Sequence, residues 1–202
     1  MVPRGAVGTM AGTLVLAGVF VAGLGVARAT DLSILYPTVR SAPAGPALSP
    51  SRPVRVAIPS IGVRAPVNPV GLATDGSIAT PPLRKLNEAG WYSGGPAPGQ
   101  DGPAIIVGHV DSTNKPAVFA KLATVRPGAL IEVTRRDRRV AVFRVDTVEQ
   151  FNKGRLPVQR VYADFSRPAI RLITCGGRWM GGETGYADNV IVFASLVTTR
   201  TA

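Results

Sequence analysis

The sequence predicts a mainly β protein, an all-β barrel or sandwich, because short β-branched runs recur along most of the chain. Each run is bounded by turn residues. They occupy residues 54–58, 104–109, 130–134, 140–148, 169–174 and 190–197. Many short strands at this spacing are typical of barrels and sandwiches rather than of βαβ folds. The glycine motifs of dinucleotide-binding folds and P-loops do not occur, so nothing in the sequence indicates nucleotide binding.

The first half of this region combines strands with one expected helix. The stretch V-R-V-A-I at 54–58 alternates between apolar and polar residues, and prolines interrupt the chain after it. The run A-I-I-V-G-H at 104–109 is apolar until its last residue. The segment 116–125 begins with proline and has apolar residues at helical spacing, so we expect a short helix there.

The second half consists of four strand-like runs. The first two, L-I-E-V-T and V-A-V-F-R-V-D-T-V, are separated by R-R-D-R-R, which predicts a hairpin whose turn is basic. We expect the four arginines of this turn, Arg135, Arg136, Arg138 and Arg139, to be solvated. The runs A-I-R-L-I-T and V-I-V-F-A-S-L-V complete the predicted set of strands.

The N-terminal region predicts export from the cytoplasm. Residues 5–27 carry no charge and no proline, and about 20 apolar residues suffice for a helix to span a bilayer. We expect residues 1–28 to form a single transmembrane anchor, with a cleaved signal peptide as the alternative. Residues 29–53 are rich in proline and alanine, which favours a semi-extended linker. Residues 54–202 would then form one extracellular domain.

The composition limits the classes of partner. The formal net charge is +11, but it is spread along the chain, and aromatic residues make up only 6%. Sparse aromatics argue against a platform for stacking nucleic-acid bases, so we expect no nucleic-acid partner. A diffuse positive surface favours contact with anionic lipid or an anionic cell wall.

The chain contains one cysteine, Cys175, and one histidine, His109. Each is a polar, titratable residue that stands at the end of an apolar strand-like run. A thiolate is the nucleophilic form of cysteine, and a neighbouring imidazole can take up or supply the proton. An unpaired cysteine is unusual in an exported protein, where cysteines mostly form disulfides. The pair therefore indicates thiol-based acyl transfer, and no metal-ligand spacing or cofactor motif accompanies it.

These residues, together with their flanking motifs, resemble the sortases, the membrane-anchored cysteine transpeptidases of Gram-positive bacteria. The resemblance covers residues 54–197 and is greatest to the class F branch of actinobacteria. It is carried by V-R-V-A-I-P-S-I-G-V-R-A-P-V, A-I-I-V-G-H-V-D, L-I-T-C-G-G and G-Y-A-D-N-V-I-V-F-A.

The resemblance implies an eight-stranded β-barrel with one or two short helices and no cofactor. It implies that Cys175 attacks a Leu-Pro-x-Thr-Gly-like sorting signal of a secreted protein and forms a thioester. His109 would act as general acid and base, and an amine of a peptidoglycan precursor would release the product.

The third catalytic position departs from the family pattern, in which an arginine holds the substrate and the developing oxyanion. The equivalent place here is Asn189, whose side-chain amide could donate a hydrogen bond to an oxyanion. Two arginines, Arg171 and Arg178, lie near the cysteine in sequence, and strand alternation places Arg171 on the face of Cys175. The sequence leaves the third role open among these three residues.

Four neighbouring residues have simpler expected roles. Thr174 should face away from Cys175 and pack, and Gly176 and Gly177 should let the chain turn and a substrate approach. Asp111 would either orient His109 or cap its loop.

Two alternatives to the sortase interpretation remain at this point. An L,D-transpeptidase also pairs histidine with cysteine outside the membrane, but the residues around Cys175 lack that family's flanking histidine and arginine. A wall-binding barrel without catalysis would explain the missing arginine.

Overall fold

The computed structural model describes residues 47–112, 115–182 and 185–202, all within the unit Arg40–Ala202. The expected anchor at 1–28 and most of the expected linker at 29–53 lie outside the described residues. Within the described ranges, no helix is both long enough and apolar enough to span a membrane.

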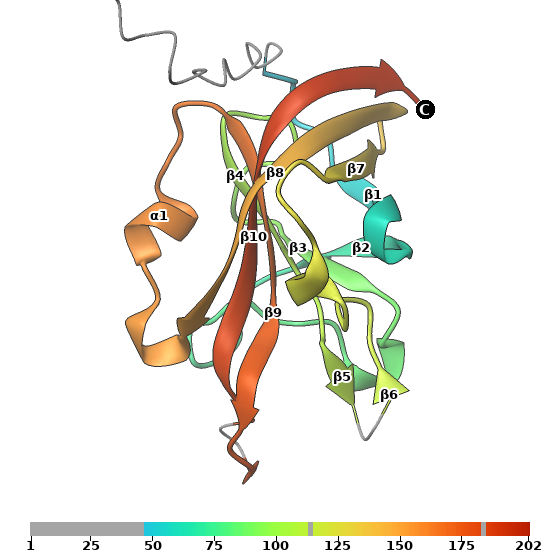
Figure 1. Cartoon of the computed structure of the whole chain (residues 1–202). Helices are drawn as coiled ribbons and strands as arrows, with labels where there is room; N and C mark the ends of the chain where they lie inside the picture. Colours follow the sequence, from blue (N-terminus) through green and yellow to red (C-terminus); the bar gives the residue numbers. More distant parts are fainter. Residues whose placement is uncertain (1–46, 113–114, 183–184) are drawn as a thin grey trace, which may run out of the picture. The chain divides into compact units, whose positions relative to one another are not determined.

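Eight strands form a closed barrel in the order β1-β2-β3-β4-β9-β10-β8-β7 (Figure 1). Their bounds are β1 Pro53–Ile58, β2 Val63–Val70, β3 Ala89–Tyr92, β4 Gly102–Val107, β7 Leu130–Arg135, β8 Arg139–Asn152, β9 Pro168–Trp179 and β10 Tyr186–Thr201. Most neighbouring strands are antiparallel, but β2–β3 and β4–β9 are parallel. The predicted eight-stranded barrel is confirmed.

Short elements connect the barrel strands. A separate two-stranded sheet pairs β5 (Asp111–Ser112) with β6 (Lys115–Pro116), and 3₁₀ turns occupy η2 (Pro59–Ile61), η3 (Leu83–Lys85), η4 (Leu122–Thr124) and η5 (Lys153–Arg155). In the part of the chain that the structure describes, the α-helix is α1 (Val158–Tyr162), which lies outside the barrel (Figure 1).

The prediction of a short helix at 116–125 is wrong. Only η4 has a helical turn in this segment. Before it, backbone N–H groups donate to carbonyls outside the segment. Ala117 N–H donates to the Val110 carbonyl, and Phe119 N–H donates to the His109 carbonyl. These bonds hold the start of the segment against other parts of the chain, and its apolar side chains reach the core from an irregular conformation.

Apolar residues form two layers on the barrel wall. The interior cluster draws on all eight strands and includes Ile106, Phe143 and Leu172. A second cluster on the outer face joins Ile105, Val107, Ile173, Ile191 and Phe193 to Val161 of α1. β4 and residues 168–173 of β9 are therefore buried on both faces, which explains why these stretches, Arg171 apart, are apolar rather than alternating.

The basic hairpin turn between β7 and β8 is confirmed, but the expectation that all its arginines are solvated is wrong for Arg135. Arg135 is 1% exposed, and its guanidinium donates to the carbonyls of Ser49 (2.5 Å) and Pro98 and to Asp137 (2.9 Å). Arg136, Arg138 and Arg139 are exposed. Arg135 is a clamp that ties the segment before β1 to the barrel.

Candidate active site

The two adjacent parallel strands β4 and β9 bring His109 and Cys175 to one edge of the barrel wall. Val107 of β4 lies opposite Ile173 of β9. Continuing this register by two residues sets His109 level with Cys175. The two backbone segments run side by side, about 4.8 Å apart. Residues that are 66 positions apart in the sequence are thus neighbours in the fold.

Two hydrogen bonds hold the chain between Val107 and His109 against β9. The Gly108 N–H donates to the Ile173 carbonyl (3.1 Å), and the Thr174 hydroxyl donates to the Gly108 carbonyl (2.8 Å). Gly108 has no room for a side chain, because a Cβ there would lie 2.6 Å from Val118. Thr174 is buried, and its hydroxyl also anchors the segment that carries His109.

His109 and Cys175 line one cavity of about 690 Å³. Asn189 lines it as well, together with residues of the loop between β2 and β3 and residues near α1. Val107, Leu156, Tyr162 and Ile173 form the apolar part of the lining. Burial raises the pKa of the Tyr162 hydroxyl. Such a cleft can exclude water from an acyl-transfer step while it leaves the thiol accessible.

A hydrogen bond to the loop between β2 and β3 holds the imidazole of His109. Its Nε2 lies 2.6 Å from the Pro81 carbonyl oxygen. A carbonyl only accepts, so Nε2 carries a proton, and in the neutral ring Nδ1 is the basic nitrogen. The same hydrogen bond persists when the ring is protonated. Nδ1 is therefore the atom at which a proton can be taken up and released.

Asn189 lies directly opposite Cys175 on the neighbouring antiparallel strand β10. Side chains of directly opposed residues have their Cβ atoms about 5 Å apart. An amide N–H at this position can donate to an oxygen that becomes negative beside the thiol.

The strand that carries Cys175 does not end there, although the sequence pattern suggested so. β9 continues to Trp179 through a β-bulge, since Gly176 pairs with Asp188 whereas Trp179 pairs with Tyr186. Gly177 at φ 75° supplies the left-handed residue of this bulge, and a Cβ there would lie 2.3 Å from the Asp188 carboxylate. Bulges are enriched beside active sites because they redirect the strand.

Neither arginine near Cys175 in sequence lines this cavity. Arg171 faces the same side of β9, but it is 7% exposed and lines a different cavity next to Phe193. Arg178 is exposed on the bulged end of β9. Of the three residues considered for the third role, the structure brings only Asn189 to His109 and Cys175.

Asp111 accepts a hydrogen bond from the hydroxyl of Tyr186, a contact that the sequence did not predict. This bond joins the segment after His109 to the start of β10, and it raises the pKa of Tyr186. Tyr186 also packs edge-on against Trp179, with ring centroids 5.1 Å apart. Asp111 therefore fixes the loop after His109 to the hairpin that carries Cys175 and Asn189.

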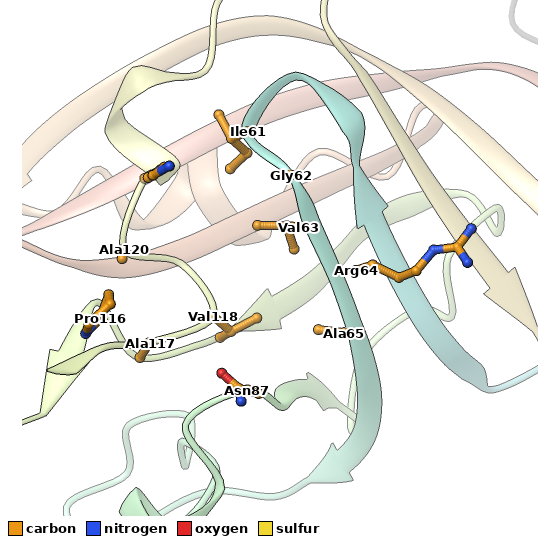
Figure 2. Close-up of a pocket in the computed structure, with 11 residues that line it drawn as sticks. Ile61, Gly62, Val63, Arg64, Ala65, Asn87, Pro116, Ala117, Val118 and Ala120 are labelled. Carbon is orange, nitrogen blue, oxygen red and sulfur yellow. The ribbon is translucent and has the colours of Figure 1, made fainter.

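A further cavity of about 430 Å³ lies between the start of β2 and the segment that follows β6 (Figure 2). Val63, Asn87 and Val118 line it, and its lining includes neither cysteine nor histidine. Among the described residues, no three His, Cys, Asp or Glu side chains gather in a group that could hold a metal ion.

A family model described as the Sortase domain matches residues 56–197, well over half of the chain. The chain belongs to the sortase family. Sortases are cysteine transpeptidases, and this sortase contains a single cysteine, Cys175. The family assignment favours the sortase interpretation over the L,D-transpeptidase alternative. A comparison with curated proteins finds no match.

Solved structures of sortases have the same fold. A pilus island 1 sortase C2 from group B Streptococcus aligns with a TM-score of 0.55 at 20% identity, over 71% of this chain and 73% of that chain. A lid mutant of sortase A from Corynebacterium diphtheriae gives 0.57 at 21% identity, over 74% and 73%. Sortase A from Listeria monocytogenes gives 0.56 at 18% identity, over 74% and 90%.

Proposed function

We propose that this sortase is a membrane-anchored enzyme that cleaves a Leu-Pro-x-Thr-Gly-like sorting signal of secreted proteins and transfers them to a cell-wall amine. The observation that supports this most is the placement of His109, Cys175 and Asn189 on one cavity. The proposal includes a single-pass anchor at 1–28, an extracellular barrel, and membership of the class F branch of actinobacteria. The apolar N-terminal stretch and the motifs around His109 and Cys175 support these parts.

In the first half-reaction, the Cys175 thiolate attacks the carbonyl carbon between threonine and glycine. The carbonyl oxygen becomes an oxyanion, and the Asn189 amide stabilises it by donating a hydrogen bond. The oxyanion then collapses, and the carbon–nitrogen bond breaks. The leaving amine takes a proton from Nδ1 of protonated His109, and the substrate remains bound to Cys175 as a thioester.

In the second half-reaction, an acceptor amine attacks the thioester carbonyl and loses a proton to Nδ1 of neutral His109. The carbon–sulfur bond breaks, which returns the thiolate and releases a new amide. The hydrogen bond from Nε2 to Pro81 keeps the ring oriented through both proton transfers.

The direct test incubates the full chain in neutral detergent with a fluorescent Leu-Pro-x-Thr-Gly peptide and an oligoglycine or diamino-acid amine. We expect a ligated product and an acyl adduct on Cys175 in the intact-protein mass spectrum. Cys175→Ala should give neither, whereas a peptide with the threonine and glycine exchanged is the matched substrate control.

The opposite result is equally clear. If folded wild-type protein gives no adduct and no product with a library that varies every position of the signal, the chain is a barrel without this activity.

A further inference from the structure

A third cavity, of about 390 Å³, lies on the outer face of the barrel, toward the opposite end of β9 from Cys175. Charged residues dominate its lining. It is formed by Asp146, Thr147, Arg160, Asp164, Arg167, Ala169, Arg171, Phe193 and Ser195. None of these residues has a place in the reaction described above, so the cavity calls for its own explanation.

Arg171 is a buried cation without a carboxylate partner among the described residues. It is 7% exposed, its Nη1 donates to the Ile170 carbonyl (3.1 Å), and its buried Nε has no acceptor. Burial lowers the pKa of this guanidinium, with the carboxylates of Asp164 and Asp146 opposing that effect only from a distance. Buried charges in proteins are normally paired and hydrogen-bonded.

Apart from Arg167, which is exposed, the other charged residues around Arg171 have partners. Arg160 donates to Glu149 through both Nη atoms, at 2.6 Å from Nη1. Asp146 accepts from Ser195 (2.6 Å). Asp164 likewise accepts from the backbone N–H and hydroxyl of Ser166. Arg171 is therefore the buried charge of this cavity that lacks a carboxylate partner among the described residues.

Phe193 concentrates positive charge at the same place. The guanidinium of Arg160 lies 4.5 Å from the centroid of this ring, and that of Arg171 lies 4.8 Å from it. Each cation–π contact is favourable, but together they hold two like charges around one ring. Glu149 offsets the charge of Arg160, so an anion beside Arg171 would relieve the repulsion that remains.

We propose that this cavity binds the carboxylate group of a small ligand, with Arg171 as the central contact. The Nε and Nη atoms of a guanidinium form a planar edge that matches two carboxylate oxygens. Since Nε lies beneath the cavity surface, the guanidinium moves slightly toward the cavity when the ligand binds. Three arginines and two aspartates line the cavity, and Glu149 offsets the charge of Arg160, so the site suits a monoanion better than a doubly charged phosphate. This inference does not rest on the proposed function.

The test is a titration of the full chain, ¹⁵N-labelled and in neutral detergent, with sodium acetate at constant ionic strength. The readout is the side-chain Nε–H resonance of Arg171, assigned by its loss in Arg171→Lys. We expect a saturable shift of this signal as acetate replaces chloride.

Three exposed positions give matched variants that should fold. Arg167→Gln removes a positive charge from the lining and should weaken acetate binding by about threefold to fivefold, whereas Asp146→Asn should strengthen it by a similar factor. Arg178→Gln removes an exposed arginine from the same strand outside the cavity and should leave binding unchanged.

Two results would overturn the proposal. If the Arg171 signal shifts linearly with acetate and responds to chloride in the same way, the cavity has no carboxylate site. Tighter binding of inorganic phosphate than of acetate would contradict the assignment of a monoanionic carboxylate.

Discussion

The two ends of the outer face of β9 differ in the hydrogen bonding and exposure of their polar residues. Arg171, Ile173 and Cys175 alternate along this face, so the arginine and the thiol lie roughly 13 Å apart on one strand. At the Cys175 end, the neighbouring polar groups His109 and Thr174 have backbone partners, and the thiol opens onto a large cleft. At the Arg171 end, a cation is buried with an unused donor.

An apolar cluster separates the two ends. Ile173 pairs with Ile191, and Val161 of α1 packs over them, so the cavities at either end have different linings. Strand alternation correctly places Arg171 on the face of Cys175, but a shared face is not a shared cavity. Under the two proposals made above, chemistry takes place at one end of the strand and ligand binding at the other.

The largest effect expected from this comparison is that of Asn189→Ala. Loss of one donor to an oxyanion typically lowers kcat by about 100-fold, and we expect that loss in the peptide–amine ligation assay. Asn68→Ala, at an exposed position of β2, is the control and should retain activity. Full activity of Asn189→Ala would move the oxyanion contact to another group.

Gly177→Ala tests the bulge at the Cys175 end. We expect a loss of about 3 kcal/mol in the free energy of unfolding, measured in urea, because the new Cβ meets Asp188 and the backbone is left-handed. Gly128→Ala has a similar φ of 88° but open space, so it should cost only about 1–2 kcal/mol. Equal losses would show that backbone strain alone, without the contact to Asp188, sets the cost.

Tyr186→Phe tests the link between the His109 and Cys175 segments. The hydrogen bond to Asp111 raises the folded-state pKa of Tyr186 above 10.0, so its contribution to stability is complete below pH 10 and disappears as pH rises through that raised pKa. Urea midpoints of wild type and Tyr186→Phe should differ at pH 7 and converge at strongly alkaline pH. A difference that does not change with pH would argue against this bond.

The smallest effect on rate is expected for Arg171→Met. This change removes the charge but keeps much of the side-chain length, so ligation should stay within about twofold of wild type, with stability unchanged or increased. A loss of activity comparable to that of Asn189→Ala would instead make Arg171 the missing catalytic cation, and the distinction between the two ends of β9 would fail.

Local patterns in the sequence were sufficient to predict six of the eight barrel strands and to single out His109 and Cys175 as candidates. β-branched runs mark the strands, and His109 and Cys175 are each unique and each follow such a run. The segment at 116–125 was predicted wrongly since its apolar spacing is compatible with a helix, whereas its backbone donors bond to distant carbonyls.

Contacts between distant positions account for what could not be predicted. Tyr186 reaches Asp111 across 75 positions, and Arg135 reaches Ser49 across 86. The Pro81 carbonyl that holds His109 belongs to a loop with no motif. Arg160 of α1 lies against the same Phe193 ring as Arg171, and α1 has only five residues, which leave little periodic signal in the sequence.

The most direct test of the account is the single-turnover rate at which a sorting peptide acylates Cys175 in wild type and in His109→Ala. We predict that His109→Ala forms the thioester at least about 100-fold more slowly, and that added imidazole restores part of the rate. If His109→Ala acylates at the wild-type rate while remaining folded, the pairing of the ends of β4 and β9 is not the catalytic centre.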